Sequence, residues 1–174
     1  MSLLRCSQKL RTALAIKPAP RPSGAPELTP PPSGALLGDW TLNLLHVRPA
    51  KLVLALSEHD RLGFLLVAMP FDTLAQRFGA ALYAHLVTLK IPPAVARREC
   101  DAMQPLIISA TTQHQNRRSI QHSMNVLSEI VQATLYEAPM PLTTLNAHLA
   151  QQVAGATSAD TAEQLVRRRL CAAR

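Results

Sequence analysis

Three apolar runs of strand length follow one another in the first half of the chain, at residues 40–47, 51–56 and 62–69. Short turns separate these runs, and the polar link 57–61 suits a hairpin loop, so the last two runs should pair as antiparallel strands. A meander of this kind has to bury at least one face of its sheet against another layer.

Helical spacing replaces the strand pattern after Pro70. Apolar residues recur every three or four positions over 71–89, which predicts a helix that covers one face of the sheet. The longest helix is expected over 119–137. Its apolar stripe consists of Ile120, Met124, Leu127, Val131 and Leu135. Shorter helices are predicted over 94–103, 142–153 and 159–172, and a further strand over 106–111.

The N-terminal segment begins with a short strand, Leu3 to Cys6, and Ser7 is a suitable N-cap for one or two helical turns. Seven of the 14 prolines then lie within 17–38. This density removes backbone donors and favours extended polyproline conformation, so we predict a surface loop inserted between the first strand and the rest of the domain.

The predicted fold class is therefore α+β, with an antiparallel β-sheet of four to five strands packed against helices and extra C-terminal helices. We expect residues 1–137 to form the α+β domain, with the proline-rich inserted loop 17–38. Residues 138–174 are expected to form a helical annex.

Composition excludes some classes of protein. Hydrophobic residues make up 48% of the chain and charged residues 17%, which allows a sizeable core and excludes general disorder. Aromatic residues make up only 3%, too few for the stacking platforms of a single-strand nucleic-acid binder. The formal net charge of +7 favours anionic partners.

Cysteine and histidine spacing predicts neither a metal nor a cofactor. Cys6, Cys100 and Cys171 lie far apart, which argues against a disulfide scaffold and a cysteine zinc site and favours a reducing cytoplasm. The histidines show no metal-ligand spacing. No apolar stretch approaches the roughly 20 residues that cross a bilayer.

One side of the predicted helix 119–137 carries a row of polar side chains opposite the apolar stripe. The row consists of Arg118, His122, Asn125, Glu129 and Tyr136. Such a row can hold a phosphate or perform acid–base chemistry, and it can equally be a solvated face. Arg117, Arg118 and Ser119 come at the start of this helix, where free N–H groups attract anions.

A second group of cations, Arg167, Arg168 and Arg169, lies near the C-terminus together with Arg174. Consecutive residues spread around a helix, so these arginines cannot all face one groove. They complement the helix dipole, or they form a tail that contacts phosphates.

Several short motifs resemble those of an uncharacterised bacterial family, a domain of unknown function found in small proteins of chromosomes and mobile elements. The resemblance covers about 6–135. It rests on Leu4-Arg5-Cys6 with Gln8-Lys9-Leu10, Asp39-Trp40 with Asn43-Leu44-Leu45, Leu52-Val53-Leu54, Asn116, Arg118-Ser119 and Ser123-Met124-Asn125. The last family motif reads Arg-Ser-x-x-Gly-Ser-Met-Asn, and here His122 occupies the glycine position. Arg118, Ser119 and Asn125 are thus the better candidates for shared site residues. The resemblance implies a fold unit and no chemistry.

We therefore expect a small cytoplasmic binding protein, from a bacterium or its mobile elements, that acts on nucleic acid or a nucleic-acid-handling complex. A regulator, a toxin–antitoxin component and an inhibitor all fit this class. The alternative is a small phosphodiesterase or ribonuclease that uses Arg118, His122, Asn125 and Glu129, so whether the chain is an enzyme stays open.

The oligomeric state predicted from the sequence is a homodimer. The strand at 3–6 is joined to the sheet through the proline segment and can pair with the edge of a neighbouring chain. The nearly continuous apolar run 62–69 indicates a strand covered on both faces, and a second protomer can provide part of that cover.

Overall fold

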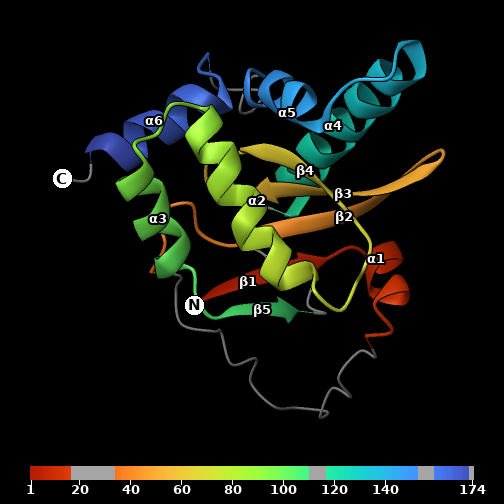
Figure 1. Ribbon diagram of the computed structural model, residues 1–174, viewed down its shortest axis with the longest axis horizontal. Coiled ribbons are helices and arrows are strands. Elements are labelled where there is room, and N and C mark those ends of the chain that lie inside the picture. Colours follow the sequence, from red (N-terminus) through yellow and green to blue (C-terminus); the bar gives the residue numbers. More distant parts are fainter. Residues whose placement is uncertain (17–33, 110–116, 153–158, 173–174) are drawn as a thin grey trace.

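The computed structural model describes residues 1–16, 34–109, 117–152 and 159–172 of the chain. These residues form one five-stranded sheet and six helices, which confirms the α+β class (Figure 1). The strands are β1 (Ser2–Cys6), β2 (Trp40–Val47), β3 (Ala50–Ser57), β4 (Gly63–Val67) and β5 (Leu106–Ser109). Their spatial order is β4-β3-β2-β1-β5.

The helices cover both faces of the sheet. They are α1 (Gln8–Ala13), α2 (Leu74–Thr88), α3 (Pro93–Ala102), α4 (Arg117–Glu137), α5 (Leu142–Ala150) and α6 (Ala162–Ala172). Figure 1 shows α2 crossing in front of the sheet with α3 and α6 beside it. The other face is covered by α4, and α5 lies at the β4 edge, where it contacts both β4 and α2. Each helix lies within a few residues of a helix predicted from the sequence.

The prediction of a purely antiparallel sheet is wrong, because β1 runs parallel to both of its neighbours, β2 and β5. The meander of β2, β3 and β4 is antiparallel, as its short turns require. Residues 7–39 join β1 to β2, and a connection of this length lets the chain return to the same end of the sheet. Of the proline-rich loop predicted over 17–38, residues 17–33 lie outside the described part of the chain.

The core on the α2 face is built around three aromatic rings. Trp40 of β2 meets Phe64 of β4 and Phe78 of α2 edge to face, with ring centroids 5.4 and 5.3 Å apart. Aromatic pairs in this arrangement add to the stability gained from burial alone. His85, two helical turns further along the same face of α2, stacks on Phe64 with 5.6 Å between the ring centroids.

The core on the other face is formed by the apolar stripe of α4 and the outward side chains of β2, β3 and β4. Ile120, Met124, Leu127 and Val131 are buried, as the helical spacing predicts, and Leu135 packs against them. Gly63 at the start of β4 lies directly under Leu127, where a Cβ would come within 2.6 Å of the leucine Cδ1. Any larger residue at position 63 would therefore have to displace the Leu127 side chain.

The edge of the sheet at β4 is closed by a side chain. Asn146 of α5 accepts a hydrogen bond from the backbone N–H of Leu65 at 2.7 Å and donates one to the Leu65 carbonyl at 3.0 Å. The amide thus replaces a neighbouring strand at this position. Both faces of β4 are covered by helices of the same chain. The homodimer and the division of the chain at residue 137 stay predictions.

The buried stripe of α4 is tested by truncation. Leu127→Ala and Val131→Ala should each lower the free energy of unfolding by about 2–4 kcal/mol, because each leaves a cavity in the core. Val126→Ala is the matched control, since Val126 lies on the same helix and is 39% exposed. Urea denaturation measures all three, and equal effects at the three positions would show that α4 does not pack through this stripe.

The buried imidazole predicts a pH dependence of stability. His85 is 4% exposed, its Nε2 has no hydrogen-bond partner among the described residues, and burial lowers its pKa to about 4. The unfolded chain takes up this proton near pH 6.5 and the folded chain does not, so stability falls as the pH is lowered from about 6.5 towards 4. His85→Leu should remove about 2 kcal/mol of the stability difference between pH 7 and 5. Urea titrations at both pH values measure this, with a variant of the exposed His122, His122→Gln, as the matched control.

Candidate functional site

A polar cleft of about 270 Å³ lies between α1, β2 and α4. We call it the β2–α4 cleft. Its lining consists of Lys9 from α1, Asn43, Leu44, Leu45 and His46 from β2, and Asn125, Ser128, Glu129 and Gln132 from α4. Three segments far apart in the sequence therefore contribute hydrogen-bonding side chains to one cavity.

The end of β1 creates this cleft. The last residue of β1, Cys6, pairs with Leu42, and the chain then turns away into α1. From Asn43 onward β2 has β3 as its only strand neighbour in the described sheet. Lys9, on the first turn of α1, reaches the space that β1 no longer fills.

Most of the polar groups of the lining have no partner. Within the described ranges, Lys9, Asn43, His46 and Glu129 make no hydrogen bond or ion pair through their side chains. Other lining residues bond locally on α4, since the Asn125 Oδ1 accepts from Gln121 at 2.9 Å and the Ser128 hydroxyl donates to the Met124 carbonyl. The cleft thus presents one cation, one carboxylate and amide groups that are free to contact a ligand, whereas His46 lines it through its backbone, because its side chain shares the phase of Leu42 and Leu44 in the α2 core.

The structure brings only part of the predicted row on α4 into this cleft. Asn125 and Glu129 line it, whereas Arg118 and His122 are exposed on α4 outside the lining. The Ser119 hydroxyl accepts a hydrogen bond from Arg61 at 3.3 Å. Arg117 begins α4, and its side chain lies outside the described part of the structure.

Helical periodicity missed Lys9, Asn43 and His46, because it compares residues within one element only. A signal for two of them was nevertheless present. Lys9 and Asn43 belong to the motifs Gln8-Lys9-Leu10 and Asn43-Leu44-Leu45, and Asn125 belongs to a third motif of the same resemblance. All three motifs contribute to the cleft.

The C-terminal arginines are already partnered. Arg167 donates to the Leu89 carbonyl and pairs with Glu163, and Arg168 pairs with Asp160. The Arg169 Nε lies 3.0 and 2.7 Å from the two carboxylate oxygens of Asp60, which is 2% exposed. The contacts of Arg167 with Leu89 and of Arg169 with Asp60 attach α6 to the rest of the fold.

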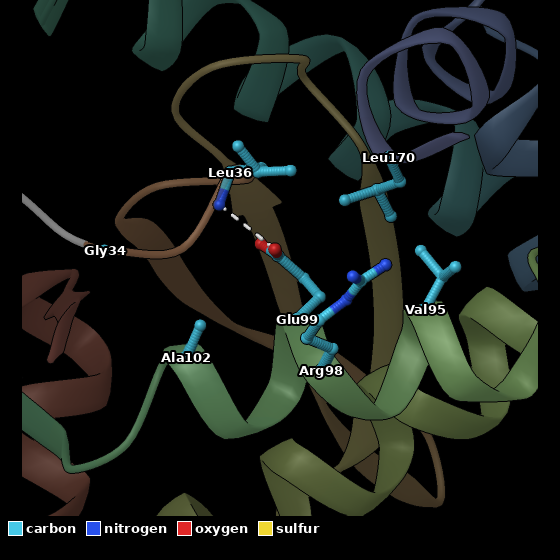
Figure 2. Close-up of a pocket in the computed structure, with 7 residues that line it drawn as sticks. All are labelled: Gly34, Leu36, Val95, Arg98, Glu99, Ala102 and Leu170. Carbon is cyan, nitrogen blue, oxygen red and sulfur yellow. Dashed lines mark hydrogen bonds between the residues drawn. The ribbon is translucent and has the colours of Figure 1, made fainter. Parts of the chain in front are cut away.

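A second cavity, of about 220 Å³, lies between α3, α6 and residues 34–36 (Figure 2). Figure 2 shows the Glu99 side chain of α3 directed at the backbone of Leu36. Its carboxylate accepts from the N–H of Leu36 at 3.0 Å and from that of Leu37 at 2.7 Å, and the residue is only 4% exposed. The buried charge is thus satisfied by backbone donors and holds the segment that leads into β2.

Asp39, at the end of that segment, joins β1 to β2. One carboxylate oxygen accepts from the Leu3 N–H at 2.9 Å and the other from Arg5 at 2.8 Å. The Arg5 Nε also lies 3.1 Å from Glu58, and the Thr41 hydroxyl donates to the same carboxylate. The motif residues Arg5 and Asp39 therefore have a structural role here.

The thiols of Cys6 and Cys100 are poor nucleophiles. Burial raises the pKa of Cys6 to about 12. Burial and the nearby Glu99 and Asp101 raise the pKa of Cys100 to about 11. Both thiols are therefore protonated at neutral pH.

Across the described ranges, no three His, Cys, Asp or Glu side chains gather as a metal site would require. None of the described helices combines the length and apolar character needed to span a bilayer.

Comparison with known families identifies the chain as a member of DUF6933, a domain of unknown function whose family model matches residues 3–162. The match extends beyond the 6–135 covered by the motifs and includes α5. No curated protein and no solved structure matches the chain.

The carboxylates of Glu99 and Glu129 should respond differently to mutation. Glu99→Ala should lower the free energy of unfolding by about 2–4 kcal/mol, because two backbone N–H groups lose a charged acceptor. Glu129→Ala should change it by less than about 0.5 kcal/mol, since the exposed Glu129 has no partner among the described residues. Thermal and urea unfolding of both variants measures the contrast. A large loss of stability in Glu129→Ala would show that this carboxylate supports the fold.

Proposed function

We propose that this member of the DUF6933 family is a non-enzymatic binding protein that holds an acidic macromolecular partner in the β2–α4 cleft. The partner is nucleic acid or a nucleic-acid-handling complex. The observation that carries the proposal is the set of unpartnered polar side chains that α1, β2 and α4 bring to one cavity. A fold does not gain stability from unpaired groups of this kind, which are therefore available to a ligand.

The charge around the cleft supports an acidic partner. Lys9 is the cation of the lining, and Arg48 and Lys51 are exposed at the β2–β3 turn, next to His46. Glu129 is the one carboxylate in the lining. With a formal net charge of +7 for the whole chain, a negatively charged partner is attracted at long range as well.

The ion pairs of the C-terminal arginines favour the cleft, and not these arginines, as the binding surface. Arg167, Arg168 and Arg169 would have to leave acidic partners before they could contact phosphates. Lys9 has no such partner to leave in the described part of the chain. We extend the proposal to a cytoplasmic regulator, toxin–antitoxin component or inhibitor in a bacterium or a mobile element, on the basis of charge and size.

The enzyme alternative keeps Asn125 and Glu129 in the cleft but has no histidine beside them among the described residues. His122 lies outside the lining, and His46 shares the strand phase of Leu42 and Leu44, whose side chains belong to the α2 core, so its imidazole lies on the opposite face of β2 from Glu129. Labelled RNA or DNA that stays intact with the wild-type chain removes this alternative, and cleavage that survives His122→Ala removes the role of His122.

The binding proposal is tested by charge reversal in the cleft. Lys9→Glu should abolish salt-sensitive binding, measured against duplex DNA, single-stranded DNA and RNA at about 50 mM salt and by affinity capture of protein complexes. Lys90→Glu is the matched control, because it makes the same charge change at an exposed residue beyond α2. An equal loss of binding in the two variants would mean that the net charge of the chain, and not the cleft, determines binding. If the wild-type chain captures no acidic macromolecule, the proposal is wrong.

A further inference from the structure

The β2–α4 cleft contains an open strand edge. Backbone groups of successive residues in a strand point alternately to its two sides. The Leu42 carbonyl accepts from the Ser7 N–H at 2.8 Å, on the β1 side. Leu44 and His46 have the same phase as Leu42, so their N–H and C=O groups also point away from β3.

The neighbouring strand confirms this phase. His46 stands opposite Lys51 in the antiparallel register, and the Lys51 carbonyl accepts from the Ala68 N–H at 2.9 Å, on the far side of β3. His46 and Lys51 therefore do not exchange backbone hydrogen bonds with each other. In the described part of the chain, the backbone groups of Leu44 and His46 have no partner.

The edge of the sheet at β4, unlike the free part of β2, is closed by a side chain. At the β4 edge, Asn146 occupies both backbone groups of Leu65. At β2, by comparison, Asn43, Asn125 and Gln132 stand around the open backbone groups without closing them. An edge of this kind is a template for an added strand.

We propose that the β2–α4 cleft binds an extended acidic segment of a partner protein, which adds to β2 at Leu44 and His46 in line with β1. The inference rests on the proposed function and names the class of partner. Two donors and two acceptors on one strand edge match the backbone of an extended peptide. Lys9 stands at the cleft wall, where it can pair with a carboxylate of that segment.

Hydrogen-bond chemistry favours a peptide over nucleic acid in this position. A phosphate group only accepts hydrogen bonds, so it would satisfy the N–H groups and leave the two carbonyls of Leu44 and His46 unpaired. A peptide strand offers an N–H and a C=O at alternate residues, about 7 Å apart, which is the spacing of Leu44 and His46 along β2.

Model peptides test strand addition directly. The parent probe is a fluorescent seven-residue peptide, Thr-Val-Glu-Thr-Glu-Val-Thr, with blocked ends that carry no charge. Two further peptides have the same side chains, with backbone N-methyl groups at the odd positions in one and at the even positions in the other. A fourth carries Lys in place of Glu. Binding to the full chain is measured by anisotropy at concentrations up to 1 mM.

The parent peptide should bind, and at least one N-methylated peptide should bind tenfold more weakly, because a methylated amide cannot donate to the Leu44 or His46 carbonyl. Lys9→Glu should weaken binding of the parent peptide at least fivefold and strengthen binding of the Lys peptide. Lys90→Glu should change the binding of neither peptide. No binding of the parent, or binding of both methylated peptides within twofold of it, would overturn strand addition.

The outcomes also separate this inference from the proposed function. If Lys9→Glu abolishes capture of an acidic macromolecule while the methylated peptides bind like the parent, the cleft binds its partner without an added strand. If duplex DNA competes with the peptide and is itself lost in Lys9→Glu, nucleic acid is the occupant. Self-association that disappears in Lys9→Glu, seen by light scattering, would make a second copy of the chain the occupant. Each of these results contradicts the peptide proposal.

Discussion

The fold depends on the carboxylate of Asp39, which fixes β1 against β2. It holds the Leu3 N–H and the Arg5 guanidinium of β1, while the next residue, Trp40, anchors β2 in the aromatic core. Glu99 fixes the segment just before Asp39 from the side of α3. The position of β1 along β2 is thereby set, and so is the point at which β1 ends. The open part of β2, and hence the cleft, follows from that register.

Much of the fold could be predicted from local pattern. The helical stripe of α4 and the meander of β2, β3 and β4 follow from spacing, because each pattern lies within one element or across one short turn. The direction of β1 could not be predicted in this way. It depends on a hydrogen-bonded carboxylate and on a connection of more than 30 residues, and neither leaves a periodic signal in the sequence.

The candidate site was predictable only in part, for a related reason. Asn125 and Glu129 were found because they share a face of one helix. Lys9 and His46 join them through the register of the sheet, and periodicity within an element carries no information about that register. The predicted C-terminal cations turned out to be partnered by acids such as Asp60, which is far from them in the sequence.

The open edge of β2 is tested most directly by amide hydrogen exchange of the free protein. The amides of Asn43 and Leu45 face β3 in the antiparallel register and should exchange slowly. Those of Leu44 and His46 face the cleft and should exchange at least about 100-fold faster, which gives an alternating pattern along one strand. Slow exchange at all four amides would show that the edge is already covered in the free chain and would contradict the account.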